Sequence, residues 1–182
     1  MRREASPDER YLTELVQALH EVGLEAIVVG ATAAVLQGAP VMTQDIDLLV
    51  RSTKRNEEKI AALAGRLGGS WLRVSVLSSV RTLVGGPLQV DLLFDALPGG
   101  LRFESLRSRA HRMQVGKHQA LVADLADIIA SKRAADRPKD RVHVPLLEDT
   151  LRVRTALQAA GLAPGNPDTG AGTLAPGDDP LR

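Results

Sequence analysis

The stretch Thr43-Gln44-Asp45-Ile46-Asp47-Leu48-Leu49-Val50 places two acids inside an apolar run. Successive side chains of a β-strand point to opposite faces, so residues two apart share a face. Asp45 and Asp47 would therefore project together, while Ile46 and Leu48 enter the buried face. Two adjacent carboxylates repel each other unless a cation lies between them, and hard divalent cations prefer oxygen ligands. The stretch predicts a strand with both carboxylates on one face, which makes it a candidate cation site.

A third acid lies in a second apolar run. Leu88 to Phe94 is expected to form a strand that carries Asp91, and Asp95 near its end is the main rival for the third ligand. If this strand pairs beside the first, three carboxylates converge. Such a set suits a two-metal clamp for in-line phosphoryl chemistry, with ions about 3.5–4 Å apart. From the pair Asp45 and Asp47 alone, an edge strand with a solvated acidic face is the favoured interpretation, and the segment upstream reverses that preference.

The upstream segment predicts a strand, a glycine and a helix in immediate succession. Ala26-Ile27-Val28-Val29 is a short buried strand, Gly30 ends it, and residues 31–36 form a helix. A helix N-terminus presents free N–H groups that can hold a phosphate, and glycine allows close approach to the backbone. By itself this junction is weak evidence, and neither a P-loop nor a dinucleotide fingerprint is present.

The remaining chain alternates helical and strand patterns, which predicts an α/β fold with a mixed twisted β-sheet flanked by helices. Gly and Pro supply eight of the last twenty residues, so a disordered tail is expected there. We expect an N-terminal helix at 1–24, a core at 25–122, C-terminal helices at 123–162 and the tail at 163–182. Further helices are predicted at 53–67, 125–135 and 140–160, and strands at 71–77 and 80–84, with a weaker β region at 111–121.

Composition excludes several classes of protein. The net charge is +1, from 23 basic and 22 acidic residues, so bulk charge predicts no membrane or nucleic-acid partner. Aromatic residues make up only 2%, too few for a base-stacking platform, and the absence of cysteine excludes disulfides and thiolate zinc sites. The charged N-terminus does not resemble a signal peptide, so a cytoplasmic protein is expected.

Three segments together resemble a known family. Val28-Val29-Gly30-Ala31-Thr32-Ala33-Ala34, the stretch at 43–50, and Ser131-Lys132-Arg133-Ala134-Ala135-Asp136-Arg137-Pro138-Lys139-Asp140 resemble the minimal nucleotidyltransferases of the DNA polymerase beta-like superfamily. Within that superfamily, the motifs most resemble those of the type IV toxin–antitoxin (abortive infection) nucleotidyltransferases. The resemblance spans about residues 25–150 and implies a nucleotidyltransferase fold.

The resemblance implies a role for each matching residue. Gly30 and Ala31 match the pair that contacts the nucleotide phosphates. Asp45 and Asp47 match the metal-bridging pair, and Asp91 matches the third carboxylate, which helps to activate the attacking hydroxyl. The implied cofactor is Mg²⁺ or Mn²⁺, and the implied substrate is a nucleoside triphosphate (NTP).

Downstream, the resemblance implies that Lys132 lies near the nucleotide and that Asp140 matches an acid that follows it. Lys132 belongs to a basic cluster, which on a surface helix is usually a solvated face but beside a triphosphate would neutralise charge. Thr43 is expected either to satisfy its own loop or to orient Asp45. The sequence departs from the family pattern at four positions, namely Ala31, Gln37, Val41 and His143. The basic cluster consists of Lys132, Arg133, Arg137, Lys139 and Arg141.

The resulting hypothesis is an enzyme that moves a nucleotidyl group from an NTP to a hydroxyl of an RNA end or a protein. It would belong to a toxin–antitoxin pair and bind an antitoxin partner. The alternative is a catalytically degenerate binding module that keeps the fold and acts through protein contacts. A purely structural α/β domain would require the three acids to lie far apart.

Overall fold

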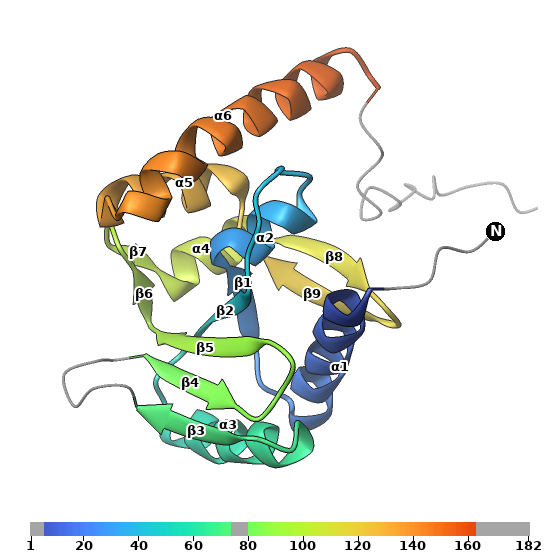
Figure 1. The fold of residues 1–182 in the computed structure, drawn as a ribbon, viewed down its shortest axis with the longest axis vertical. Helices are drawn as coiled ribbons and strands as arrows, with labels where there is room; N and C mark the ends of the chain where they lie inside the picture. Colours follow the sequence, from blue (N-terminus) through green and yellow to red (C-terminus); the bar gives the residue numbers. More distant parts are fainter. Residues whose placement is uncertain (1–5, 74–79, 163–182) are drawn as a thin grey trace, which may run out of the picture.

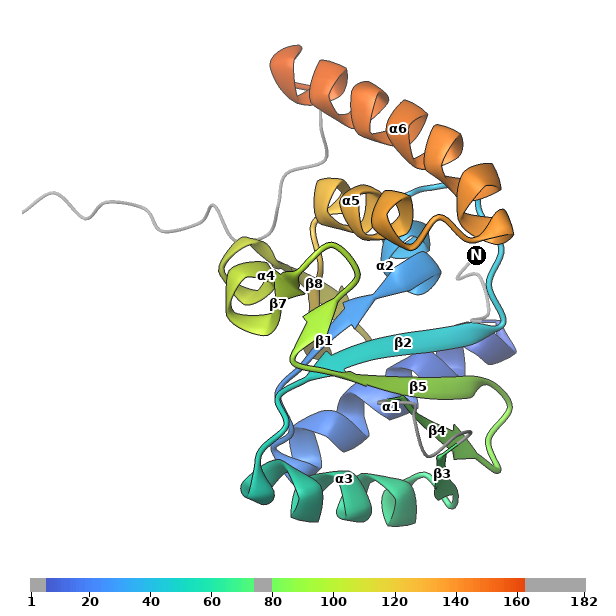
Figure 2. The same ribbon diagram turned by 90° about the vertical axis from the view of Figure 1, so that its left-hand side faces the viewer.

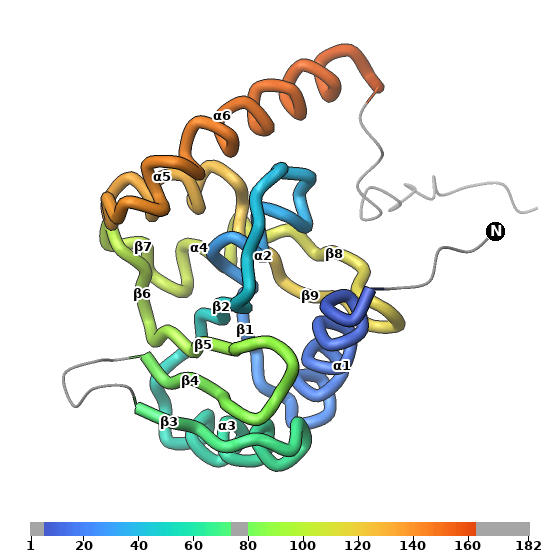
Figure 3. Tube along the Cα trace, in the orientation of Figure 1, coloured from blue at the N-terminus to red at the C-terminus, as the bar shows by residue number. Residues whose placement is uncertain are grey.

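A seven-stranded mixed sheet forms the centre of the molecule (Figure 1). The structure is a computed structural model, and it describes residues 6–73 and 80–162. The strands lie in the order β3-β4-β5-β2-β1-β9-β8, and β6 and β7 form a separate two-stranded ribbon. The central strand β2 pairs antiparallel with β1 and parallel with β5. Figure 3 traces the same path along the chain.

The elements have the following bounds. The helices are α1 (Pro7–Val22), α2 (Gly30–Leu36), α3 (Lys54–Arg66), α4 (Phe103–Arg109), α5 (Leu125–Ala135) and α6 (Pro138–Ala159). The strands are β1 (Ala26–Val29), β2 (Asp45–Val50), β3 (Ser70–Arg73), β4 (Arg81–Val84), β5 (Gln89–Phe94), β6 (Ala96–Leu97), β7 (Leu101–Arg102), β8 (His111–Val115) and β9 (His118–Val122).

The first helix begins and ends where its sequence dictates. The Ser6 hydroxyl accepts a hydrogen bond from the backbone N–H of Glu9, and the Glu9 carboxylate accepts one from the backbone N–H of Ser6. This capping box satisfies two of the N–H groups that a helix start leaves free. Gly23 ends α1 with φ of +65°, a left-handed conformation that glycine adopts without strain.

Helices cover both faces of the sheet. In Figure 2, α1 and α3 lie on one side of β2 and β5, and α2, α5 and α6 lie on the other. Leu48, Leu49 and Val50 are completely buried, because β2 is a central strand with helices over both faces. Asp45 and Asp47 differ from these residues and are only partly buried, although Ile46 between them is buried, because the two acids share the face that lines a pocket.

The predicted fold class is confirmed, whereas several local elements were not predicted. Helix α4 and the ribbon β6–β7 were missed because they are short: α4 has seven residues and buries only Phe103 and Leu106. The strand predicted over 71–77 is β3 (Ser70–Arg73), and its later residues lie outside the described part of the chain, as does the predicted tail at 163–182. Within 6–73 and 80–162, no helix is long and apolar enough to cross a membrane.

Candidate functional site

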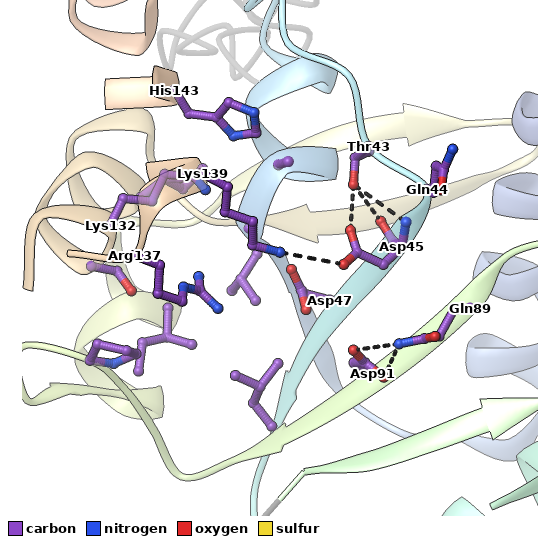
Figure 4. A pocket seen from close by; sticks show the side chains of 18 of the residues that line it. Thr43, Gln44, Asp45, Asp47, Gln89, Asp91, Lys132, Arg137, Lys139 and His143 are labelled. Atoms are coloured by element: carbon purple, nitrogen blue, oxygen red, sulfur yellow. Dashed lines mark hydrogen bonds and ion pairs between the residues drawn. The ribbon is translucent and has the colours of Figure 1, made fainter. Parts of the chain in front are cut away.

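The structure brings Asp45, Asp47 and Asp91 together at one end of the central strands (Figure 4). Because β2 and β5 run parallel with Asp47 opposite Asp91, these two side chains leave the same face of the sheet side by side. Asp45 follows on that face by the two-residue period of β2. One carboxylate oxygen from each residue lies within 4.8 Å of the other two, so the three can share a ligand.

Neighbouring side chains hold two of these carboxylates. The Thr43 hydroxyl lies 2.5 Å from Asp45 Oδ1 and 3.0 Å from the Asp45 carbonyl oxygen, so both predicted roles of Thr43 are within its reach. The hydroxyl of Thr82, a buried residue of β4, donates to Asp91 Oδ1 at 2.6 Å. The Gln89 amide donates to both oxygens of Asp91, at 3.0 and 3.1 Å. Donors of this kind fix the direction of a carboxylate.

Asp47, in the middle of the cluster, experiences strong electrostatic repulsion. Burial, followed by the charges of Asp45 and Asp91, raises the pKa of Asp47 to about 6, and Lys139 and Arg137 oppose the rise. A carboxylate with two negative neighbours and little water favours any arrangement that brings a positive charge close. The cluster therefore has the electrostatic character of a cation site made of hard oxygen ligands.

Gly30 is needed beside Asp47 for two separate reasons. Its φ of +65° is a left-handed conformation that residues with a side chain rarely adopt. A Cβ atom at this position would also lie 2.0 Å from Asp47 Oδ2 and 3.0 Å from Asp47 Cγ, which is closer than atoms can approach. The short helix α2 starts at this residue, and its Thr32 hydroxyl donates to the Asp45 carbonyl oxygen at 2.8 Å. The backbone of α2 is thus built against the acidic cluster.

The three carboxylates lie in a pocket of about 680 Å³, within the roughly 300–1,000 Å³ common for small-molecule sites. Gly30, Ala31, Thr43 and Lys132 also line it, whereas Asp140, the acid that the resemblance also implied, does not. Arg137 and Lys139 of the basic cluster line it too, as does His143. The sequence assigned no role to the other lining residues, which are Val29, Met42, Gln44, Gln89, Leu93, Leu97, Pro98, Ile128 and Ser131.

Basic side chains from α5 and α6 form the wall opposite the acids. Lys132 is buried, and its ammonium group donates to Asp140 Oδ1 at 2.9 Å, with Asp140 only 1% exposed. Arg137 binds the second oxygen of the same carboxylate at 2.6 Å. Lys139 instead reaches across the pocket, and its Nζ lies 3.9 Å from Asp45 Oδ2 (Figure 4). The cation nearest to the acidic cluster is therefore Lys139, although the resemblance pointed to Lys132.

Two further residues depart from simple expectations. Asp95, the rival third ligand, has φ of +63° and accepts a hydrogen bond from the Ser52 N–H at 2.8 Å, so it holds a loop and lies outside the cluster. His143 lines the pocket, and its buried Nδ1 has no hydrogen-bond partner among the described residues. Burial and then the charge of Lys132 lower the pKa of His143, so the imidazole is neutral near pH 7.

Comparison with known proteins identifies the fold. No protein-family model matches the sequence, and no curated protein sequence is significantly similar to it. Among solved structures, the antibiotic-resistance factor ANT(2'')-Ia in complex with adenylyl-2''-tobramycin matches with a TM-score of 0.58 and 14% identity, covering 86% of this chain and 99% of that one.

Two other solved structures agree. A Thermotoga maritima protein assigned as a nucleotidyltransferase matches with a TM-score of 0.52 and 19% identity, covering 87% of this chain and 98% of that one. An antigenic nucleotidyltransferase-like protein from Paracoccidioides brasiliensis matches with a TM-score of 0.50 and 15% identity, covering 87% and 78%. Together with the sheet order and the flanking helices, these matches show that the chain has the nucleotidyltransferase fold.

Proposed function

We propose that this protein is a metal-dependent nucleotidyltransferase, which moves a nucleotidyl group from an NTP to a hydroxyl acceptor. The observation that carries the proposal is the gathering of three carboxylate oxygens within 4.8 Å of one another, in a pocket whose opposite wall is basic. Acids alone would suit many cation sites. Acids facing cations across a pocket of this size suit a ligand that carries phosphates and arrives with divalent ions.

The donor set fits Mg²⁺ or Mn²⁺. All three side chains offer oxygen atoms, and the burial of Asp47 together with the charges of Asp45 and Asp91, which raise its pKa, favours a divalent cation between them. A bound divalent cation would stabilise the charge that develops around the α-phosphorus and would lower the pKa of the attacking hydroxyl.

The chain's own residues would divide the remaining tasks. Asp45 and Asp47 hold the cation, and Asp91, oriented by Thr82 and Gln89, receives the hydrogen bond of the acceptor hydroxyl and accepts its proton. The acceptor oxygen forms its bond to the α-phosphorus while the bond from that phosphorus to the pyrophosphate oxygen breaks. The protein needs no nucleophilic side chain, which agrees with a sequence that contains no cysteine.

For the acceptor we propose a hydroxyl of an RNA end or of a protein, and for the biological setting a toxin–antitoxin pair in the cytoplasm with an antitoxin partner. Both follow from the resemblance of the sequence motifs. One solved structure of this fold holds an adenylylated aminoglycoside, which adds small polyhydroxyl compounds to the acceptors that deserve a test.

A degenerate binding module is the second candidate, and two observations favour it. Lys132 is engaged by buried Asp140, and Ala31 places a methyl group where, by the resemblance of the motifs, glycine or serine is expected. A module of this kind would bind its partner without regard to Asp45.

The test is transfer of label from each α-labelled NTP to total RNA, to a protein extract and to tobramycin. We expect transfer by the wild type in the presence of Mg²⁺ and its near-complete loss in Asp45→Asn and Asp91→Asn, because the first variant removes a charge that holds the cation and the second removes the carboxylate that accepts the proton. Asp95→Asn is the matched control, since this acid lies on the same segment but outside the cluster. Equal labelling by all four proteins would refute the assignment, and no labelling with any NTP would favour the binding module.

A further inference from the structure

The contact between Lys139 and Asp45 is the one ion pair that crosses the pocket among the described residues (Figure 4). Lys132 and Arg137 are both engaged by the buried carboxylate of Asp140, at 2.9 and 2.6 Å. Lys139 has no such fixed partner on its own helix, and its side chain is 57% exposed. The ammonium group of Lys139 can therefore interact with the acidic cluster, whereas the charges of Lys132 and Arg137 are already paired with Asp140.

This ion pair is weak and easily exchanged. The two charged atoms are 3.9 Å apart in a partly solvated position, where a unit pair interacts by little more than it does in water. The lysine head is a compact charge on a flexible four-carbon stem, so it can move several ångströms without any change in the backbone. A divalent cation that binds Asp45 carries twice the charge and repels the ammonium group from its position.

We propose that Lys139 is a counter-ion that changes partner: it pairs with Asp45 when no metal is bound, is displaced by the divalent cation, and then binds the triphosphate that arrives with that cation. The inference rests on the proposed function, since it assumes that the pocket takes a metal and a triphosphate. It adds that the binding of the metal and the binding of the triphosphate are coupled. Lys139 disfavours the metal alone and favours the metal together with the triphosphate, so the two ligands bind cooperatively.

The coupling predicts effects of opposite sign from a single substitution. Lys139→Gln keeps a polar side chain that is one atom shorter and removes the charge. It should bind Mn²⁺ alone about fivefold more tightly, which corresponds to about 1 kcal/mol for a unit charge near 4 Å in water. The same variant should bind Mn²⁺ with inorganic tripolyphosphate at least about tenfold more weakly, because a charge-assisted contact to phosphate is lost.

Two further variants control the experiment. Lys139→Arg keeps the charge and should retain both wild-type affinities to within a few fold. Arg141→Gln removes the same charge two residues further along α6, where the side chain pairs with Asp136 and does not line the pocket, and it should change neither affinity. Mn²⁺ binding is measured by electron paramagnetic resonance, and tripolyphosphate binding by calorimetry. Because tripolyphosphate has no base, the test does not depend on which NTP is used.

Opposite shifts in Lys139→Gln, with wild-type behaviour in Arg141→Gln, would support the partner exchange. If the wild type binds both ligands but Lys139→Gln changes neither, or weakens both, the inference falls and the proposed function stands. If the wild type binds neither Mn²⁺ nor Mn²⁺-tripolyphosphate, the proposed function fails, and the inference fails with it.

Discussion

Replacing Gly30 by alanine tests the geometry of the acidic cluster without touching any acid. The added Cβ would lie 2.0 Å from Asp47 Oδ2 and 3.0 Å from Asp47 Cγ. Because the close contacts include Cγ as well as Oδ2, a rotation of the carboxylate alone does not relieve them, and the whole Asp47 side chain must shift. We therefore expect Gly30→Ala to fold but to bind divalent cations poorly.

The size of the effect follows from two separate contributions. Forcing alanine into a left-handed conformation costs about 1–2 kcal/mol. In a chain of 182 residues, a loss of that size lowers Tm by about 2–8 °C, at about 2–4 °C for each kcal/mol. Displacing Asp47 should weaken Mn²⁺ binding on the order of 10–100-fold or more, since this range applies even to groups that only orient a ligand.

Gly68→Ala is the matched control. Gly68 has φ of +64°, nearly identical to the +65° of Gly30, but a Cβ there would meet no atom within 4 Å. Thermal unfolding of both variants, with and without saturating Mn²⁺, separates the two contributions, because a ligand that binds only the folded state raises Tm. Both variants should lose similar stability without metal, and only Gly30→Ala should lose the metal-dependent rise. A full metal-dependent rise in Gly30→Ala would refute the reasoning.

Substitutions at three other positions address the site and its support. The folded-state pKa of Asp47 is raised to about 6 from 3.8, so this group's contribution to stability is present below about pH 3.8 and is lost as pH rises to about 6. Asp47→Asn should therefore stabilise the metal-free protein above pH 6, by at most about 3 kcal/mol. Urea unfolding across that pH range measures the difference. Thr82→Val removes the hydroxyl that donates to Asp91 and should lower the rate of nucleotidyl transfer with little change in Tm. Thr82→Ser keeps a hydroxyl and should retain the rate. An unchanged rate in Thr82→Val would show that this hydrogen bond is dispensable. Asp140→Ala leaves the buried ammonium of Lys132 without its partner and should lower the free energy of unfolding by about 3–5 kcal/mol, measured by chemical denaturation. A decrease below about 1 kcal/mol would indicate that the ion pair is solvated.

The fold was predictable from the sequence where hydrophobic periodicity is strong. The alternation of acids and apolar residues in β2 identified both its strand character and the face that carries the acids, since the period of two leaves no other arrangement. Helix α4 and the β6–β7 ribbon carry too few buried residues to give such a pattern, and contacts from outside hold them, such as the Arg51 guanidinium over the Phe103 ring.

The sequence predicted the acidic cluster only on the condition that the two acid-bearing strands pair. Its assembly depends on the pairing of β2 with β5 in the register that sets Asp47 opposite Asp91, and sequence spacing does not specify which strands pair. The choice between Asp91 and Asp95 illustrates the limit. Both lie at spacings that share a strand face, but the chain turns at Asp95, which adopts a positive φ and accepts the Ser52 N–H.

The sequence does not predict which of the basic residues in the pocket is free to bind a ligand. Lys132, Arg137 and Lys139 are equally charged in the sequence, and the family resemblance selects Lys132. Their availability differs only in the folded protein, where the buried carboxylate of Asp140 engages the first two and leaves the third facing Asp45. A cation that is already paired in a buried site contributes to the position of α5 and α6, whereas an exposed and weakly paired cation can follow a ligand. The distinction implies that charge removal at Lys132 should act mainly on stability, and charge removal at Lys139 mainly on ligand affinity.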